Sequence, residues 1–197
     1  DGSMGPIQFF DNGLHERTNV VISESTGDPA TVNRWNVAYR SENLTTGNVS
    51  LRGLQINAGG GIISGPSDLV SLPAGEDLDE VDVSEALSVD GYSPTHAISY
   101  DLDSPSAQNT HIVFCRGTSV VNTISLQLSE HAHMNRQRSE ARLSTSYEDF
   151  MVSYLELLPG GDFEVFITSF DLTEGRYMAI SERKTFLGLT GMNGWFI

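Results

Sequence analysis

The chain of 197 residues holds 26 acidic side chains against 11 basic ones, which gives a formal net charge of −15. A charge of this sign repels phosphate backbones and anionic lipid surfaces, so it argues against nucleic-acid binding and membrane insertion. The hydrophobic content of 39% still supports a folded core, and the length suits a single domain.

The first four residues bear on the extent of the domain, and the single cysteine bears on the compartment in which it folds. We expect residues 1–4, which read Asp-Gly-Ser-Met, to be the remnant of an expression tag, and residues 5–197 to form one β domain. Cys115 is the single cysteine, so the chain forms no internal disulfide. Since secreted domains of this size commonly use disulfides, their absence favours folding in the cytosol. We expect no cofactor.

Short stretches rich in Val, Ile, Phe and Tyr alternate along the chain with segments rich in Gly, Ser, Thr and Asn. This pattern predicts an all-β, antiparallel sandwich or barrel-like domain with long loops and little helix. In chain order, the predicted strands cover Ile7–Phe10, Asn19–Ser23, Trp35–Tyr39, Val49–Ile56, Leu69–Leu72, Ala97–Leu102, His111–Cys115, Ser119–Leu128, Met151–Leu158, Phe163–Phe170, Tyr177–Ile180 and Phe186–Leu189.

The segment Met151–Leu158 has two interpretations. Pro159-Gly-Gly-Asp162 follows it and suits a turn into the strong strand Phe163–Phe170, which favours a hairpin. A helix competes for the same residues, because Phe150, Tyr154 and Leu158 stand at helical spacing. We favour the hairpin. The strand Phe163–Phe170 carries apolar residues on both of its faces, which predicts a position between two layers.

Seven carboxylates fall within residues 76–90, and no basic residue lies among them. Calcium is one interpretation, because hard cations prefer carboxylate oxygens, yet the segment lacks the residue spacing of a calcium loop. We favour a solvated loop or an edge strand whose like charges discourage pairing between molecules. A contact surface for a basic partner is another interpretation.

A basic segment runs from His131 to Arg142 and includes His133, Arg136 and Arg138. If the preceding strand continues, His131 and His133 share a face, as in a two-histidine metal pair, but no spacing identifies further ligands. We therefore assign no metal. Arginines in a loop suit the bidentate capture of carboxylates, as on sialic acid or an acidic protein. Internal salt bridges to the acidic segment are the interpretation we prefer.

No catalytic motif is present. The glycine cluster Asn57–Gly61 lacks the Lys-Ser/Thr ending of a phosphate-binding loop. The following segment Gly61–Gly65 does not fit the Gly-x-Ser-x-Gly elbow of hydrolases, because Ser64 stands one place too late. We expect a tightly turned surface loop at the cluster and no enzymatic activity. An acidic-site hydrolase remains a second alternative because the chain is so acidic, although no carboxylate pair stands apart from the others.

In its many short strands and polar loops, the whole chain resembles the projecting domains of non-enveloped virus capsids. It is most similar in texture to an astrovirus capsid spike, with a β-rich core between Val49–Ile56 and Arg176–Ile180. The resemblance implies a dimeric spike on the virion surface, assembled in the host cytoplasm, that attaches to a host-cell receptor and meets antibodies. The receptor is then a protein or a glycan.

A carbohydrate-binding module or a phage fibre tip is the first alternative to the viral spike. Such a module predicts a shallow site with an exposed aromatic side chain, for which Trp35 and Tyr92 are candidates. Together with the basic segment, these aromatics complete the predicted receptor- or ligand-binding set: His131, His133, Arg136, Arg138, Trp35 and Tyr92.

Overall fold

The computed structural model describes residues 13–24, 34–84, 95–104, 107–127, 129–138, 148–161, 163–173 and 176–186. These residues form β-strands and the turns between them, with no helix in the described part. The strands are β1 (His15–Glu24), β2 (Arg34–Asn43), β3 (Val49–Asn57), β4 (Ile62–Ser71), β5 (Asp77–Val83), β6 (Thr95–Ser104), β7 (Ala107–Arg116), β8 (Ser119–Gln127), β9 (Ser129–Arg138), β10 (Glu148–Leu157), β11 (Phe163–Thr173) and β12 (Arg176–Phe186).

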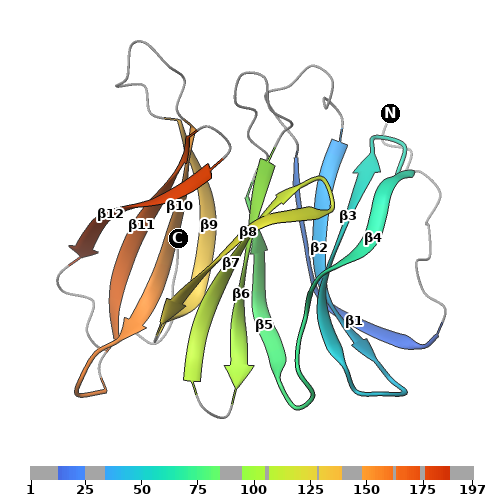
Figure 1. Ribbon diagram of the computed structural model, residues 1–197, viewed down its shortest axis with the longest axis horizontal. Helices are drawn as coiled ribbons and strands as arrows, with labels where there is room; N and C mark the ends of the chain where they lie inside the picture. Colours follow the sequence, from blue (N-terminus) through green and yellow to red (C-terminus); the bar gives the residue numbers. More distant parts are fainter. Residues whose placement is uncertain are drawn as a thin grey trace, which may run out of the picture.

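The described strands form three antiparallel sheets of four strands each, with consecutive strands as neighbours: a first sheet of β1–β4, a middle sheet of β5–β8 and a third sheet of β9–β12. Figure 1 shows the middle sheet between the other two. The chain thus makes three successive meanders and stacks them in three layers. The predicted all-β antiparallel fold of the sandwich type is confirmed, whereas the third layer was not predicted.

One core lies between the first and middle sheets. Leu51 from β3, Leu78 from β5 and Val113 from β7 are almost completely buried in it, together with Ile98 and Tyr100 from β6. The burial follows the strand period of two, because Val113 and Cys115 point towards the first sheet while Ile112 and Phe114 point away. This alternation gives the middle sheet one apolar face.

A second core covers the opposite face of the middle sheet. Ile112 and Phe114 of β7 are fully buried there with Ala97 of β6, and Val152 and Tyr154 of β10 close the core from the third sheet. The continuous apolar run Ile112–Cys115 therefore supplies side chains to both cores. A strand that is apolar at both parities is typical of a sheet buried on both faces.

The hairpin prediction at Met151–Leu158 is confirmed. β10 pairs with β11 without a register shift, and the Gly161 N–H donates to the Leu158 carbonyl at 3.1 Å within the turn. Among the described strands the position between layers predicted for Phe163–Phe170 is not found, because β11 belongs to the outer third sheet while β6 and β7 lie between layers. The continuous run in β7 has the same sequence pattern and actually takes that position.

Two strands with polar sequences were not on the list of predicted strands. β5 comes from the acidic segment and forms an edge of the middle sheet, which confirms the edge-strand interpretation of its first half. β9 comes from the basic segment, which is a strand up to Arg138 rather than a loop. The predicted strands at Ile7–Phe10 and after Phe186 lie outside the described residues.

Candidate binding surface at the loop end

The connections between strands differ in length at the two ends of the stack. Three of them are long: residues 25–33 between β1 and β2, 84–94 between β5 and β6, and 139–147 between β9 and β10. Every other connection between described strands has five residues or fewer. Because binding residues are commonly carried by loops on a rigid frame, the position of these three connections matters for function.

The three long connections start and finish at the same end of the stack, which we call the loop end. Figure 1 shows β1, β5 and β9 finishing at one end, where β2, β6 and β10 begin. The Ser23 hydroxyl donates to the Ser84 carbonyl at 2.5 Å, so the ends of β1 and β5 lie side by side. The Ser64 and Thr118 hydroxyls, 2.9 Å apart, join the start of β4 in the first sheet to the β7–β8 turn of the middle sheet at this end.

Arginine is concentrated at the strand termini of the loop end. Arg34 is the first residue of β2, Arg116 the last of β7, Arg138 the last of β9 and Arg176 the first of β12. Among the strand termini at this end, Glu24 and Glu148 are the acidic residues. At the other end the strand termini include Asp77 and no arginine. The loop end thus holds four of the ten arginines of an acidic chain.

The glycine cluster forms a tight turn at the loop end, as predicted. The Asn57 side-chain oxygen accepts hydrogen bonds from the N–H groups of Gly59 and Gly61, both at 2.9 Å. The Asn57 N–H donates to the Gly61 carbonyl, also at 2.9 Å. Asparagine is well suited to this role because its side chain can replace a backbone acceptor in a turn. The turn gives the loop end a fixed backbone position between β3 and β4.

The predicted site residues divide between the two outer sheets. Trp35 is half-buried at the loop end of β2, where it pairs with Glu24 and Ile56. Arg136 and Arg138 lie near the loop end of β9, in the third sheet. The middle sheet separates Trp35 from β9, so the two do not form one compact site. Tyr92 lies outside the described residues.

The two histidines of the basic segment lie lower in β9, away from its end. His133 pairs with Ser153 of β10, but Glu130 pairs with Leu155, so the register shifts between these pairs. A register shift of this kind interrupts the strict alternation of faces along a strand. The regular pairing that the predicted shared face of His131 and His133 assumed is therefore interrupted in this part of β9.

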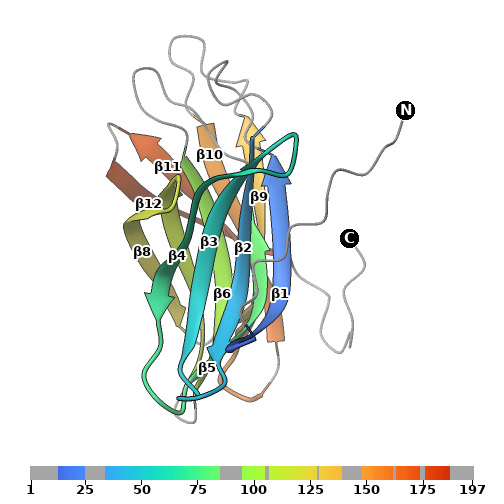
Figure 2. The same ribbon diagram turned by 90° about the vertical axis from the view of Figure 1, so that its right-hand side faces the viewer.

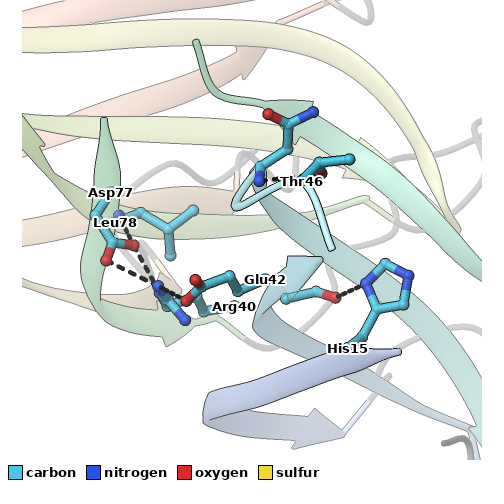
Figure 3. Close-up of polar contacts among 8 residues, drawn as sticks. His15, Arg40, Glu42, Thr46, Asp77 and Leu78 are labelled. Carbon is cyan, nitrogen blue, oxygen red and sulfur yellow. Dashed lines mark hydrogen bonds and ion pairs between the residues drawn. The ribbon is translucent and has the colours of Figure 1, made fainter. Parts of the chain in front are cut away.

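A charged network occupies the opposite end of the stack (Figure 3). The Arg40 guanidinium donates to both oxygens of Asp77, at 2.6 and 2.8 Å, and its Nη2 atom also donates to Glu42 at 2.8 Å. This geometry joins β2 of the first sheet to β5 of the middle sheet. A bidentate arginine–carboxylate pair is a strong and directional contact. The sequence analysis missed Arg40, although an arginine directly after the apolar run Val37–Tyr39 is a signal that a partner is needed.

The network shifts the pKa values of Arg40 and Asp77 in opposite directions. The hydrogen bond to Asp77 raises the pKa of Arg40. Burial alone would raise the pKa of Asp77, but hydrogen bonds from Arg40 and the Leu78 N–H outweigh burial and lower it. Both groups are therefore charged at neutral pH. The acidic segment has a structural counter-charge in Arg40, while the predicted salt bridges to the basic segment concern side chains outside the described set.

The buried titratable groups of the middle sheet are neutral at pH 7. Burial lowers the pKa of His96 to about 4 and raises the pKa values of Cys115 and Tyr100 to about 12. Cys115 is therefore a thiol with little nucleophilic character. Tyr100 stacks on His111 with ring centroids 5.2 Å apart. Among the described residues, no group of three or more His, Cys, Asp or Glu side chains is placed to hold a metal ion.

Comparison with known proteins gave no match: no protein-family model, curated protein or solved structure corresponds to this chain. The resemblance to a capsid spike stays a prediction. The described part of the chain contains no helix of the length and apolar character needed to cross a membrane.

Proposed function

We propose that the chain is a receptor-binding projection domain of a non-enveloped virus capsid, which attaches the particle to host cells through the loop end and catalyses no reaction. The observation that carries the proposal is the asymmetry of the stack. All three long connections leave from one end, and the strand termini there hold four arginines. A rigid β frame that presents variable loops at one end is a common design of binding proteins.

The arginines favour a receptor with anionic groups. A guanidinium can donate two parallel hydrogen bonds to a carboxylate or sulfate, which gives both affinity and orientation. The matching receptors are acidic glycans and acidic segments of cell-surface proteins. Because the whole chain carries a charge of −15, an anionic receptor would bind at these arginines in preference to the acidic surface elsewhere.

The protonation states of the buried side chains Cys115 and His96 support the part of the proposal that excludes catalysis. Cys115 and His96 are opposite each other in the β6–β7 register, a pair that could suggest a nucleophile and a base. Burial holds both in the neutral form, and both side chains are enclosed by the core. A thiol and an imidazole in this state pack as core residues and do not activate one another.

The proposal is tested by attachment of the domain to cultured animal cells and to a glycan array, with the domain clustered on beads so that weak sites act together. Arg138→Gln removes one positive charge at the loop end. Lys184→Gln is the matched control, since it removes one positive charge near the other end of β12 in the same sheet.

We expect saturable attachment that weakens in high salt and falls at least tenfold in the Arg138→Gln domain, with little change for Lys184→Gln. Salt sensitivity follows from the screening of charge pairs. Absence of attachment to every cell type and glycan, or equal losses for the two variants, would contradict the proposal.

A further inference from the structure

Six strands form the edges of the three sheets in the described part of the chain: β1, β4, β5, β8, β9 and β12. An edge strand presents a row of backbone N–H and C=O groups with which a strand of another molecule can pair. Proteins suppress such pairing with charged residues, with proline or with irregular register along the edge. The edges that lack this protection therefore show where another chain can be added.

Five of the six edges are protected in one of these ways. The sequence of β5 has four acidic residues among seven, and the sequences of β1, β9 and β12 have at least three charged residues each. β4 contains Pro66 and Asp68, and its pairing with β3 shifts register three times. Addition of a further strand to any of these five edges is therefore disfavoured.

β8 is the edge without such protection. Its sequence Ser-Val-Val-Asn-Thr-Ile-Ser-Leu-Gln contains no charged residue, no proline and no glycine. The pairing of β8 with β7 shifts register once, beside Val121, and is regular from Asn122 to Gln127. Figure 2 shows β8 on the left-hand side of the stack, where it forms the border of the middle sheet. Exposed residues along it are Ser119, Val120, Val121, Thr123 and Ser125. The segment 122–127 is thus a regular, uncharged and accessible edge.

One backbone donor of this edge is held by a side chain. The Thr123 N–H donates to the side-chain oxygen of Asn122 at 2.9 Å, in an exposed contact. The contact takes the place of a ladder hydrogen bond, so the Thr123 N–H points away from β7 and towards the free edge. A side-chain amide can rotate away from this N–H. An incoming strand can therefore displace the Asn122 oxygen and accept the hydrogen bond itself.

The two faces of β8 define the side chains that an added strand needs. Ile124 and Leu126 are half-buried and pack against the second core, on the side of the third sheet. Thr123 and Ser125 lie on the opposite face and are exposed. Neighbouring strands are stabilised by like pairs across the sheet, apolar beside apolar and polar beside polar. The strand that fits this edge therefore alternates apolar and polar residues.

We infer that the edge of β8 binds an extended peptide segment of another protein, which adds to the middle sheet as a fifth strand. The segment alternates β-branched apolar residues with polar ones and is uncharged or basic. Charge selects this partner, because an acidic peptide and a second copy of a chain with a formal charge of −15 are both repelled on approach. Backbone hydrogen bonds supply the affinity and the alternating side chains supply the selectivity. The segment 122–127 runs along the side of the stack away from the loop end, so the inference does not depend on the proposed function.

The inference is tested by fluorescence anisotropy with a labelled peptide that alternates threonine with valine and carries a lysine at each end. The same peptide with its backbone nitrogens methylated keeps the side chains but cannot donate hydrogen bonds. Thr123→Pro removes the N–H at the free edge, a position where an edge strand tolerates proline. Thr123→Val is the matched control, because it keeps this N–H. Asn122→Ala removes the competing side-chain oxygen. Circular dichroism checks that each variant is folded, and sedimentation velocity measures self-association.

We expect the wild-type chain to bind the unmethylated peptide with a dissociation constant of about 100 μM or below and not to bind the methylated one. Binding should weaken about fivefold or more in Thr123→Pro, stay within about twofold in Thr123→Val, and tighten by about twofold or more in Asn122→Ala.

Three results would overturn the inference: no binding at about 1 mM peptide, equal binding of the two peptides, or a folded Thr123→Pro chain with wild-type affinity. If Thr123→Pro does not fold, the Asn122→Ala chain decides, because a gain in affinity supports the inference and an unchanged or lower affinity overturns it. A wild-type dimer that Thr123→Pro abolishes would place a second copy on the edge and would also overturn it.

Discussion

Protonation of His96 should make the stability of the domain depend on pH in the weakly acidic range. His96 lies on β6 and is 4% exposed, and its Nδ1 atom finds no hydrogen-bond partner among the described residues. Burial lowers its pKa from 6.5 to about 4. In the unfolded chain the imidazole takes up a proton near pH 6.5, whereas in the folded chain it does so only near pH 4.

The sign and size of the effect follow from this difference. Between pH 6.5 and 4 the unfolded state binds more protons, so the free energy of unfolding falls as the pH is lowered through this range. At 1.36 kcal/mol for each pH unit, the full loss contributed by His96 is about 3 kcal/mol, of which about 2 kcal/mol is already present at pH 5. Above pH 7 the contribution is constant.

The assay compares urea unfolding of the wild-type and His96→Leu chains between pH 7.5 and 4.5, followed by tryptophan fluorescence. Leucine has a similar volume and does not titrate. Burial also lowers the pKa of His111, and the carboxylates lose charge in acid, but both effects are common to the two chains. The pKa of Asp77 is lowered, so its protonation changes the stability only at a pH below this range.

The stability difference between the two chains isolates His96. It should move in favour of His96→Leu by about 2 kcal/mol from pH 7.5 to pH 5. A difference that stays constant within about 0.5 kcal/mol over that range would refute the reasoning, because it would mean that the folded chain accepts a proton on His96 without penalty.

Three further substitutions test the packing. Phe114→Ala empties a fully buried position in the second core and should lower the free energy of unfolding in urea by about 3–5 kcal/mol; a loss below about 1 kcal/mol would contradict the three-layer stack. Tyr39→Phe removes a buried hydroxyl without a hydrogen-bond partner among the described residues, so stability should stay equal or rise by about 1 kcal/mol, and a clear loss would reveal a missing partner. Gly65→Ala should destabilise more than Gly47→Ala in the same assay, because both have positive φ but only at Gly65 would a Cβ meet a backbone atom, 2.6 Å from the Gly53 carbonyl oxygen; equal losses would show that the backbone there can move.

The strands with apolar side chains were predictable, whereas the charged strands were predicted only as alternatives to a loop. β7 and β10 carry enough apolar residues to be recognised without knowing the fold. β5 and β9 are edge strands with charged side chains, and their strand conformation depends on one neighbour each. A sequence window does not contain that neighbour, because the pairing is a tertiary contact.

The contacts between layers were beyond sequence reasoning for a different reason. Arg40 and Asp77 are 37 residues apart, and their pairing depends on how the first sheet is placed on the middle sheet. The same holds for the first sheet, because the sequence of β2 does not show which of its two sides the middle sheet covers.

The loop end itself could be predicted only in part. Arg138 and Trp35 were selected for their chemistry, and the structure places both near one end of the stack. The common position of Arg34, Arg116 and Arg176 was not predicted, because it depends on the direction of every strand in three meanders. Strand direction follows from the hairpin connections once their number is known.

The central claim is that attachment occurs at the loop end, and site-directed blocking tests it most directly. Ala58→Cys places a thiol in the β3–β4 turn at the loop end, and Ala74→Cys places one in the β4–β5 connection at the other end; both positions are exposed. The native Cys115 is fully buried, so a maleimide-linked polymer should label only the new thiol. We predict that the polymer at position 58 abolishes attachment to cells and that the polymer at position 74 leaves it intact. Unimpaired attachment with position 58 labelled, or equal loss at both positions, would contradict the account.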